Sequence, residues 1–391
     1  VGRQYTLYVY GLVDLAGNTS QYRTYYFNTL FEADTESPTI TMMTLYDGSQ
    51  NVPTNTQIHI ALSEGINPVG MKDSGQIQLK DSGDVEIPFN FSVNSTHDKL
   101  TIIPIDILAP DSAYTLIISG ISDRAGNLLA TDEIANFNTA SGLDVLNGAY
   151  VQFSPAQGNT NVPLNTEISV RFDERVDPTS ITSTSFYLYD SVKAQAVLGD
   201  WSLSENDQRL SFVPAAALEA HRTYTLYWSY NAFLTDLAGN RVGAYHYTSF
   251  TTGDASLNSP LNIEPNFSDG SLGIPVNPRL TLNSDTPFSR ICIDDSTAVL
   301  VEGVNSTSMN ISLSDANTLT LGVSDILTAS TTYTLTLSGV CDYAGILLPD
   351  YEMTFTTSAA DVADSLAPSL LSIVPADESV AVDPGTSIVV T

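Results

Sequence analysis

The sequence repeats itself with a period close to 110 residues, and this period limits the fold to several similar domains in a row. Its clearest mark is a Tyr-Thr-Leu segment, which begins at Tyr5, Tyr114, Tyr224 and Tyr333 and so recurs after 109, 110 and 109 residues. A chain of 391 residues is long enough for several hydrophobic cores. We therefore treat each period as one domain.

Two more motifs keep the same spacing. A turn of the pattern Asp-x-Ala-Gly-Asn follows each Tyr-Thr-Leu segment, and a Phe-x-Thr motif closes the period. The turns begin at Asp14, Asp123, Asp236 and Asp342, and the closing motifs begin at Phe27, Phe137, Phe250 and Phe355. In the fourth turn Ile346 stands where the other copies have Asn, so this copy departs from the pattern.

These motifs divide the chain into three complete repeats and two partial ones. The complete repeats span residues 38–140, 149–253 and 260–358. Residues 1–37 are interpreted as the C-terminal half of a repeat, and residues 366–391 as the N-terminal part of a further one. Half a sandwich cannot cover its own apolar face, so both partial repeats are expected to need neighbouring sequence or a partner chain.

Alternating apolar residues predict the secondary structure of each repeat. A proline-containing segment, such as Asn-Val-Pro at 51–53 and 161–163, precedes a stretch with apolar residues at every second position, over 58–62 and 168–172. A period of two predicts a strand with one buried face. About seven short strands in roughly 100 residues, without a helical period, predict an antiparallel β-sandwich.

The tyrosine of the Tyr-Thr-Leu segment lies six residues after a leucine in the three complete repeats. In a Greek-key sandwich this is the position of a tyrosine corner, in which the hydroxyl bonds to backbone upstream. We interpret these tyrosines as structural, the alternative being exposed rings that stack on a ligand. The four residues are Tyr5, Tyr114, Tyr224 and Tyr333.

Taken in order, these motifs resemble the bacterial Ig-like repeat family of S-layer proteins and large surface adhesins. The resemblance rests on Asn-Val-Pro, on an acidic segment after the second strand (63–64 and 173–174), on Tyr-Thr-Leu and on Asp-x-Ala-Gly-Asn. It covers almost the whole chain and implies an all-β, elongated array of tandem antiparallel Ig-like or fibronectin III-like sandwiches, located extracellularly at the cell surface. The third complete repeat departs from the pattern, with Ser284-Asp285 as its acidic segment and with Ile346.

The charge of the chain is strongly negative. Its 44 acidic and 14 basic residues give a formal net charge of -30 at pH 7. Such a charge repels nucleic acids and anionic membrane surfaces and attracts divalent cations, so we expect no nucleic-acid partner. No apolar run approaches the roughly 18 to 20 residues that cross a bilayer, and we expect no membrane insertion within this segment.

No set of residues that could catalyse a reaction recurs with the repeat. The four histidines, His59, His97, His221 and His246, occupy unrelated repeat positions, and the third complete repeat has none. A Ser-His-Asp or Cys-His set is therefore not repeated, and histidine and cysteine are too sparse there for a four-ligand zinc site. We predict that the chain is not an enzyme.

Calcium is the one cofactor that the sequence favours, because oxygen ligands are abundant. The alternative is that each aspartate caps its own turn while glycine supplies a positive φ, which needs no metal. The candidate ligands are Asp14, Asp123, Asp236, Asp342, Glu64, Asp173 and Glu174, with linker acids such as Asp34, Glu36, Asp361 and Asp364.

Two kinds of covalent site are also candidates. Cys292 and Cys341 lie in one predicted repeat and fit either a single disulfide or two buried thiols. Six Asn-x-Ser/Thr sequons are candidate glycosylation sites. They are Asn18, Asn90, Asn94, Asn266, Asn305 and Asn310.

Three functions fit this organisation. The leading hypothesis is a structural stalk or filament segment of a large cell-surface protein, whose partners are neighbouring repeats of the same longer chain. A second is a self-assembling subunit of a sheath, S-layer or fibre, whose partners are copies of itself. A third is a module that binds a host or surface glycan or protein through loops, for which aromatics such as Trp201, Trp228 or Tyr245 would have to cluster in one patch.

Overall fold

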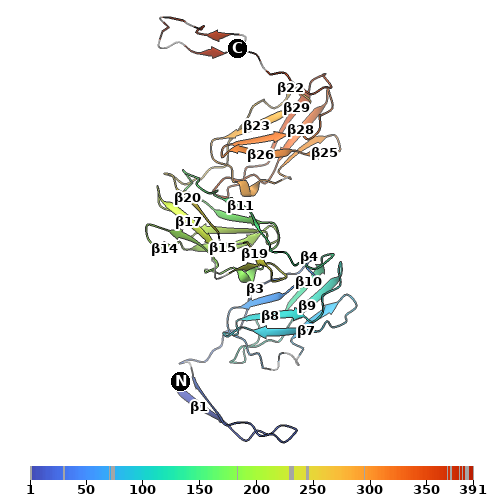
Figure 1. Ribbon diagram of the computed structural model, residues 1–391, viewed down its shortest axis with the longest axis vertical. Coiled ribbons are helices and arrows are strands. Elements are labelled where there is room, and N and C mark those ends of the chain that lie inside the picture. Colours follow the sequence, from blue (N-terminus) through green and yellow to red (C-terminus); the bar gives the residue numbers. More distant parts are fainter. Residues whose placement is uncertain are drawn as a thin grey trace. The chain divides into compact units, whose positions relative to one another are not determined.

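The protein is described by a computed structural model (Figure 1). It covers residues 2–29, 31–69, 71, 75–182, 184–228, 233–243, 246–294, 296–367, 369, 372–377, 379–380, 382–383 and 387–390. The chain divides into two compact units. The first comprises Val1–Gln152, Val170–Phe212 and Thr223–Phe250, and the second Phe153–Ser169, Val213–Arg222 and Thr251–Thr391.

The first complete repeat is a sandwich of two four-stranded sheets (Figure 1). One sheet has the order β3-β5-β8-β7 and the other β4-β10-β9-β6. All neighbours are antiparallel except β4 and β10, which are parallel. The strands are β3 (Ile40–Met43), β4 (Ser49–Val52), β5 (Ile58–Leu62), β6 (Ile77–Asp81), β7 (Phe89–Val93), β8 (Lys99–Pro104), β9 (Ala113–Ile118) and β10 (Glu133–Thr139).

The second complete repeat contains two further four-stranded sheets and a short ribbon. The sheets have the orders β11-β12-β16-β15 and β14-β13-β17-β20, and the ribbon is β18-β19. The elements are β11 (Tyr150–Ser154), β12 (Ile168–Phe172), the 3-10 helix η1 (Pro178–Ser180), β13 (Phe186–Asp190), β14 (Gln195–Ala196), β15 (Gly199–Ser204), β16 (Arg209–Pro214), β17 (Thr223–Trp228), β18 (Leu234–Thr235), β19 (Arg241–Val242) and β20 (His246–Thr251).

The third complete repeat has the same plan with one extra edge strand. Its sheets have the orders β21-β23-β27-β26 and β22-β29-β28-β24-β25, and β22 lies parallel to β29. The elements are β21 (Ile263–Pro265), β22 (Ser271–Ile274), β23 (Arg279–Ser284), the 3-10 helix η2 (Arg290–Cys292), β24 (Ala298–Glu302), β25 (Asn305–Ser308), β26 (Asn310–Asp315), β27 (Thr318–Gly322), β28 (Thr332–Leu337) and β29 (Tyr351–Thr357).

The two partial repeats form short antiparallel pairs. Near the N-terminus β1 (Gln4–Val9) pairs with β2 (Arg23–Asn28), and near the C-terminus β30 (Ile373–Val374) pairs with β31 (Val389–Val390). Tyr5 stacks on Phe27 with ring centroids 5.6 Å apart, yet Tyr5 is 46% exposed. No helix among the described residues is long and apolar enough to cross a membrane.

Alternating side chains build the core of each complete repeat. On β5 the predicted apolar positions are buried and the positions between them are not, as a strand with one core face requires. In the first repeat the buried cluster combines Ile58 and Leu100 of one sheet with Leu116 and Phe137 of the other. The all-β, antiparallel sandwich predicted from the repeat is confirmed.

The tyrosines of the complete repeats are buried near the start of an interior strand, against the phenylalanine of the closing motif. The Tyr114 hydroxyl accepts a hydrogen bond from the Ala109 backbone N–H at 2.9 Å, and the Tyr333 hydroxyl accepts one from Thr328 N–H at 3.0 Å. These are the upstream backbone bonds that define a tyrosine corner. Tyr224 is 2% exposed, and its ring lies 5.9 Å from that of Phe250.

Candidate functional sites at the repeat junctions

Several of the candidate site residues lie where successive complete repeats meet. We call the contacts between residues 38–140, with the linker that follows them, and residues 149–253 the first junction. The contacts between residues 149–253 and 260–358 are the second junction. Every first-junction contact given below lies within the first compact unit, and every second-junction contact within the second.

The first junction is built on the Asp-x-Ala-Gly-Asn turn of the second repeat. The carbonyl of Leu237, the residue after the turn aspartate, accepts hydrogen bonds from the Thr56 hydroxyl at 3.0 Å and the Gln57 N–H at 2.8 Å. The Gln57 side chain also donates to the Ala238 carbonyl at 3.0 Å. Thr56 is fully buried, so water is excluded from its hydrogen bond with Leu237.

The second junction repeats this geometry one period later. The carbonyl of Tyr343 accepts hydrogen bonds from the Thr166 hydroxyl at 2.9 Å and the Glu167 N–H at 2.8 Å. In addition, the Tyr343 hydroxyl donates to Asn159 Oδ1 at 3.1 Å. The turn motif therefore has a second role beside its own conformation, since it presents a carbonyl to the preceding repeat.

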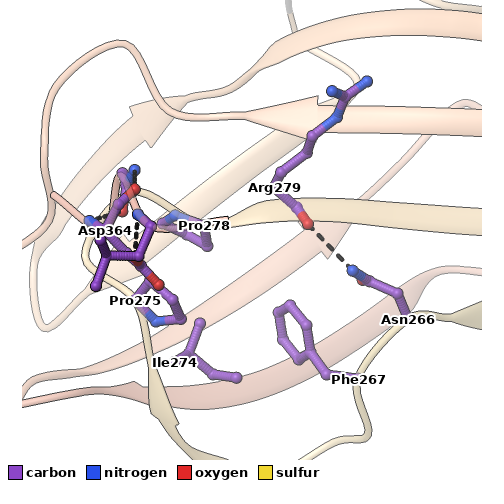
Figure 2. A pocket seen from close by; sticks show the side chains of 9 residues that line it. Asn266, Phe267, Ile274, Pro275, Pro278, Arg279 and Asp364 are labelled. Atoms are coloured by element: carbon purple, nitrogen blue, oxygen red, sulfur yellow. Dashed lines mark hydrogen bonds between the residues drawn. The ribbon is translucent and has the colours of Figure 1, made fainter. Parts of the chain in front are cut away.

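The asparagine two residues after the proline of each complete repeat, in Asn-Val-Pro-x-Asn in the first two, forms hydrogen bonds with the following linker. Asn55 Nδ2 donates to the Asp144 carbonyl at 2.6 Å, and Asp144 N–H donates back to Asn55 Oδ1 at 2.8 Å. Figure 2 shows the copy at Asp364, which lines a pocket together with Phe267 and Ile274. The same pair of bonds joins Asn165 to Leu257 and Asn277 to Asp364. The repeated Asn was the sequence signal for this contact, and sequence reasoning missed it.

Three predicted acids gather at the start of the first repeat. One carboxylate oxygen each from Asp34, Glu64 and Asp123 lies within 4.8 Å of the others. Asp123 also caps its own turn, because Oδ1 accepts from the Gly126 and Asn127 N–H groups at 2.7 and 2.8 Å. Burial opposes ionisation of Asp123, but the hydrogen bonds from Asn127 outweigh it and lower the pKa of this carboxyl.

The equivalent acids gather at the first junction. Asp144 of the linker, Glu174 after the second strand and Asp236 of the turn place one oxygen each within 4.8 Å of one another. The Asn240 side chain donates to Asp236 Oδ2 at 2.9 Å and to the Asp144 carbonyl at 3.2 Å. Two of the three acids, Glu174 and Asp236, are sequence-predicted candidates that the fold brings together.

The electrostatics of this second cluster favour a bound proton or cation. Burial, the charge of Asp236 and a hydrogen bond with Asp144 raise the pKa of Glu174 to about 8. Burial also raises the pKa of Asp236, against the hydrogen bonds from Asn240. At neutral pH, Glu174 therefore keeps its proton, because three carboxylates cannot ionise freely at this spacing.

The remaining candidate acids lie outside these clusters. Asp14 caps its turn through the N–H groups of Ala16 and Asn18. Asp173 accepts a hydrogen bond from Ala149 N–H at 2.7 Å. Asp342 Oδ1 accepts hydrogen bonds from the N–H groups of Ala344 and Ile346. Its Oδ2 is buried without a hydrogen-bond partner among the described residues. The Asn that bonds this oxygen in the other copies is Ile346 here.

A buried carboxylate that sequence reasoning missed completes the first junction. Asp177, fully buried, precedes η1, and its Oδ2 lies 2.6 Å from His59 Nδ1 on β5. The Thr44 hydroxyl donates to Asp177 Oδ1 at 3.0 Å, and Thr179 contributes both its N–H and its hydroxyl. Nothing in the sequence indicates this contact at His59, because its partner lies 118 residues away.

The two cysteines form a disulfide. Cys292 ends η2 and Cys341 precedes the turn aspartate, with Cα atoms 5.7 Å apart. Of the two alternatives left open by the sequence, the structure contains the bond.

The sequons remain candidates with different local roles. Asn18, Asn94, Asn266 and Asn310 use their side-chain amides as hydrogen-bond donors within the chain. Asn90 and Asn305 are exposed on β7 and β25. Glycosylation stays a prediction.

The two tryptophans pack inside the second repeat. Trp228 is 1% exposed and packs edge-on against Phe172 and Phe186. Trp201 lies against Phe186 and Phe212. Tyr245 lies outside the described residues. The two tryptophans therefore do not supply the exposed aromatic patch that a loop-binding module would need.

Comparisons with solved structures find matches of low similarity. The N-terminal part of the bacterial S-layer protein SbsC is 13% identical, with a TM-score of 0.24, and the match covers 54% of this chain and 44% of that one. CopC from Methylosinus trichosporium OB3b is 18% identical, with a TM-score of 0.22, covering 29% and 98%. Titin domains Z1Z2 in complex with telethonin are 12% identical, with a TM-score of 0.19, covering 57% and 100%.

The family comparison is more specific. No curated protein matches the chain. A model of the bacterial Ig-like domain matches residues 34–139, 149–252 and 262–357, which is most of the sequence. The chain belongs to the bacterial Ig-like domain family.

Proposed function

We propose that this chain is a structural stalk or filament segment of a large extracellular cell-surface protein, and that it spaces or supports an adhesive part. The observation that carries the proposal is the repeated hydrogen bonding at the junctions. At each junction two donors of one repeat bond the turn carbonyl of the next, at Leu237 and at Tyr343. Such bonds leave little freedom between neighbouring repeats.

The linkers support the same proposal. Asn55 and Asn165 each fix the following linker through two hydrogen bonds, so the linker is part of the preceding sandwich and not a flexible spacer. The net charge of -30 suits an exposed protein, because it keeps copies of the chain apart in solution.

Small-angle scattering of the whole chain tests this proposal. The native chain should give a maximum dimension of about three or more sandwich lengths and a cross-section of one sandwich. An Asn55→Ala/Asn165→Ala variant should bend and give a smaller radius of gyration. The matched control is Asn90→Ala/Asn305→Ala, at two exposed asparagines on strands. A native particle as flexible as the Asn55→Ala/Asn165→Ala variant would overturn the stalk.

The other two functions make different predictions in the same experiment. A self-assembling subunit of a sheath, S-layer or fibre predicts particle mass that grows with concentration. A glycan- or protein-binding module needs no fixed spacing between repeats, so it does not predict a native particle stiffer than the Asn55→Ala/Asn165→Ala variant. It also lacks support from Trp201 and Trp228, which pack against the core.

Calcium remains a prediction, now with two specific places. The clusters around Asp123 and Asp236 supply carboxylate oxygens, the ligands that Ca²⁺ prefers, and their three oxygens lie close enough to share one ion. Since Glu174 holds a proton at neutral pH, Ca²⁺ binding at Asp236 would release it. Affinity there should therefore rise as the pH approaches 8.

Calorimetric titration with Ca²⁺ tests this prediction, with a dissociation constant on the order of 0.1 to 1 mM expected for an extracellular module. Asp144→Asn should weaken one of the two binding events. Asp173→Asn, at a neighbouring acid outside the cluster, should not. If neither variant changes the titration, the turn aspartates act as caps alone.

A further inference from the structure

The disulfide of the third repeat joins the two segments through which this repeat contacts the second. Cys292 ends η2, whose N-cap is Ser289. Cys341 lies two residues before Tyr343, whose carbonyl is the acceptor at the second junction. The covalent bond therefore spans the junction side of the repeat and not only its interior.

The contacts on either side of the bond reach different parts of the second repeat. On the η2 side, Ser289 Oγ lies 2.7 Å from Ser154 Oγ, and this contact is buried. On the turn side, Tyr343 bonds Thr166, Glu167 and Asn159. These contacts form together only if η2 and the turn keep their spacing, which is the spacing that the disulfide fixes.

At the first junction, the positions equivalent to Cys292 and Cys341 are occupied by other residues. Asp177 N–H bonds the Thr235 carbonyl at 2.7 Å, as Ser289 N–H bonds the Cys341 carbonyl at 2.8 Å, so the two pairs are equivalent. Thr235 lies one residue before the turn aspartate of the second repeat, as Cys341 does in the third, so these two positions are equivalent. Ser180 follows Asp177 by three residues, as Cys292 follows Ser289, so Ser180 and Cys292 are also equivalent. Ser180 Oγ accepts a hydrogen bond from Thr235 N–H at 3.2 Å.

The two junctions also differ in the polar contact beside this position. The first has the buried Asp177 with His59 and Thr44 as partners. The second has two neutral hydroxyls, Ser154 and Ser289. A neutral hydroxyl pair contributes less than a charge-assisted one, so the second junction depends more on the spacing of its two segments.

We propose that the Cys292–Cys341 disulfide stabilises the second junction and that its reduction weakens this junction. When the bond is present, η2 and the turn are held for simultaneous contact with the second repeat. When an external dithiol reduces it, the S–S bond breaks, two electrons and two protons give two thiols, and the dithiol becomes its own disulfide. The second junction then loosens while the first does not change.

The burial of the two sulfur-bearing residues is compatible with such a reduction. Cys341 is 1% exposed, whereas Cys292 is only partly buried. An attacking thiolate would therefore meet the Cys292 sulfur first and release the thiolate of Cys341. The proposal rests on the junction contacts and does not depend on whether the chain is a stalk or an assembling subunit.

Amide hydrogen exchange of the whole chain, oxidised and reduced with dithiothreitol, tests the proposal. The Glu167 amide reports the second junction, because it donates to Tyr343, and the Gln57 amide reports the first, because it donates to Leu237. The amides of β28 report the fold of the third repeat. Reduction should accelerate exchange at Glu167 about tenfold or more and leave Gln57 unchanged, and β28 should stay better protected than Glu167.

A Cys292→Ser/Cys341→Ser variant completes the test. It should show fast exchange at Glu167 with and without dithiothreitol, which excludes an effect of the reagent itself. Unchanged exchange at Glu167 in the reduced protein would overturn the proposal. Exchange at β28 as fast as at Glu167 in the reduced protein would also overturn it, because the third repeat would then be unfolded and the loss would not be confined to its junction.

Discussion

The two junctions of this chain use the same backbone geometry and close it with different chemistry. In both, a threonine hydroxyl and the next N–H bond the carbonyl that follows a turn aspartate. The first junction adds a buried carboxylate with imidazole and hydroxyl partners, and the second adds neutral serines and a disulfide. The repeated motif thus determines the hydrogen bonds to the turn carbonyl at each junction, while individual side chains determine which conditions weaken the junction.

This difference follows from the cost of burying a charge. Asp177 is fully buried, and its oxygens are bonded by His59, Thr44 and Thr179. A buried carboxylate with all its partners specifies one geometry, but losing one partner leaves an unpaired charge in a medium of low dielectric constant. A disulfide carries no charge, so burying it has no such cost. It is broken by reductants instead.

The largest expected effect is that of the disulfide on the third repeat. The bond closes a sequence separation of 49 residues, for which the chain-entropy model gives about 4 kcal/mol. Cys292→Ser/Cys341→Ser should lower the free energy of unfolding of the third repeat by about this amount, as measured by denaturant titration. The control is a Ser180→Ala variant, which removes the equivalent hydrogen bond from Thr235 N–H and the bond that Ser180 Oγ donates to the Asp177 carbonyl. Similar losses in both variants would contradict the comparison.

His59→Ala should weaken the first junction next most strongly. It leaves Asp177 buried with hydroxyl and N–H partners only, at a cost of about 3 kcal/mol. Ser169→Ala changes the equivalent strand position in the second repeat and should cost about 1 kcal/mol or less. Thermal unfolding of both variants compares them. A loss at His59 no greater than at Ser169 would show that the carboxylate is not a source of stability.

Acid should separate the two junctions. Burial opposes ionisation of Asp177, but the hydrogen bonds from His59 and Thr179 outweigh it, so the pKa of Asp177 lies below 3.8. A carboxyl with a depressed pKa stabilises the folded state above its unfolded pKa and loses this contribution as the pH falls through the folded value. The Gln57 amide should therefore lose exchange protection below about pH 4.

The second junction should not follow this acid response. Burial raises the pKa of Asp342, so its protonation favours the folded state, and its contribution falls as the pH rises from 3.8 through the folded value. The Glu167 amide, corrected for the intrinsic rate, should keep its protection where Gln57 loses it. Parallel loss at both amides would contradict the assignment of the acid response to Asp177.

The smallest expected effect comes from restoring an absent amide. Ile346→Asn should place a donor beside the buried Oδ2 of Asp342, as Asn240 does for Asp236 at 2.9 Å. One satisfied buried acceptor contributes about 1 kcal/mol. The reverse change, Asn240→Ile, should cost the second repeat a similar amount. Differential scanning calorimetry measures both, and a destabilised Ile346→Asn variant would contradict this account of the turn.

The repeat period and the alternation of apolar residues were enough to predict the sandwich and its tyrosine corners. Both depend on contacts within one repeat, such as Tyr114 with Ala109, and local periodicity reports such contacts directly. The acids of the two clusters were predicted as separate candidates, except Asp144, which was missed because it meets Asp236 only through the fold of the linker.

The junctions were beyond sequence reasoning for a physical reason. His59 and Asp177 belong to different repeats, and their contact depends on which faces of two finished domains meet. The contact of Asn55 with Asp144 was missed as well. Asparagine is common in the turns of proline-containing loops, and no neighbouring residue marks Asn55 as the partner of Asp144.

The central claim is that neighbouring repeats are held in one arrangement by their junction contacts. A distance distribution between spin labels at Ser92→Cys on β7 and Ser202→Cys on β15 tests it most directly, because both positions are exposed and lie in successive repeats. The account predicts one narrow distribution, which Asn55→Ala broadens. A broad distribution in the otherwise native chain would contradict it.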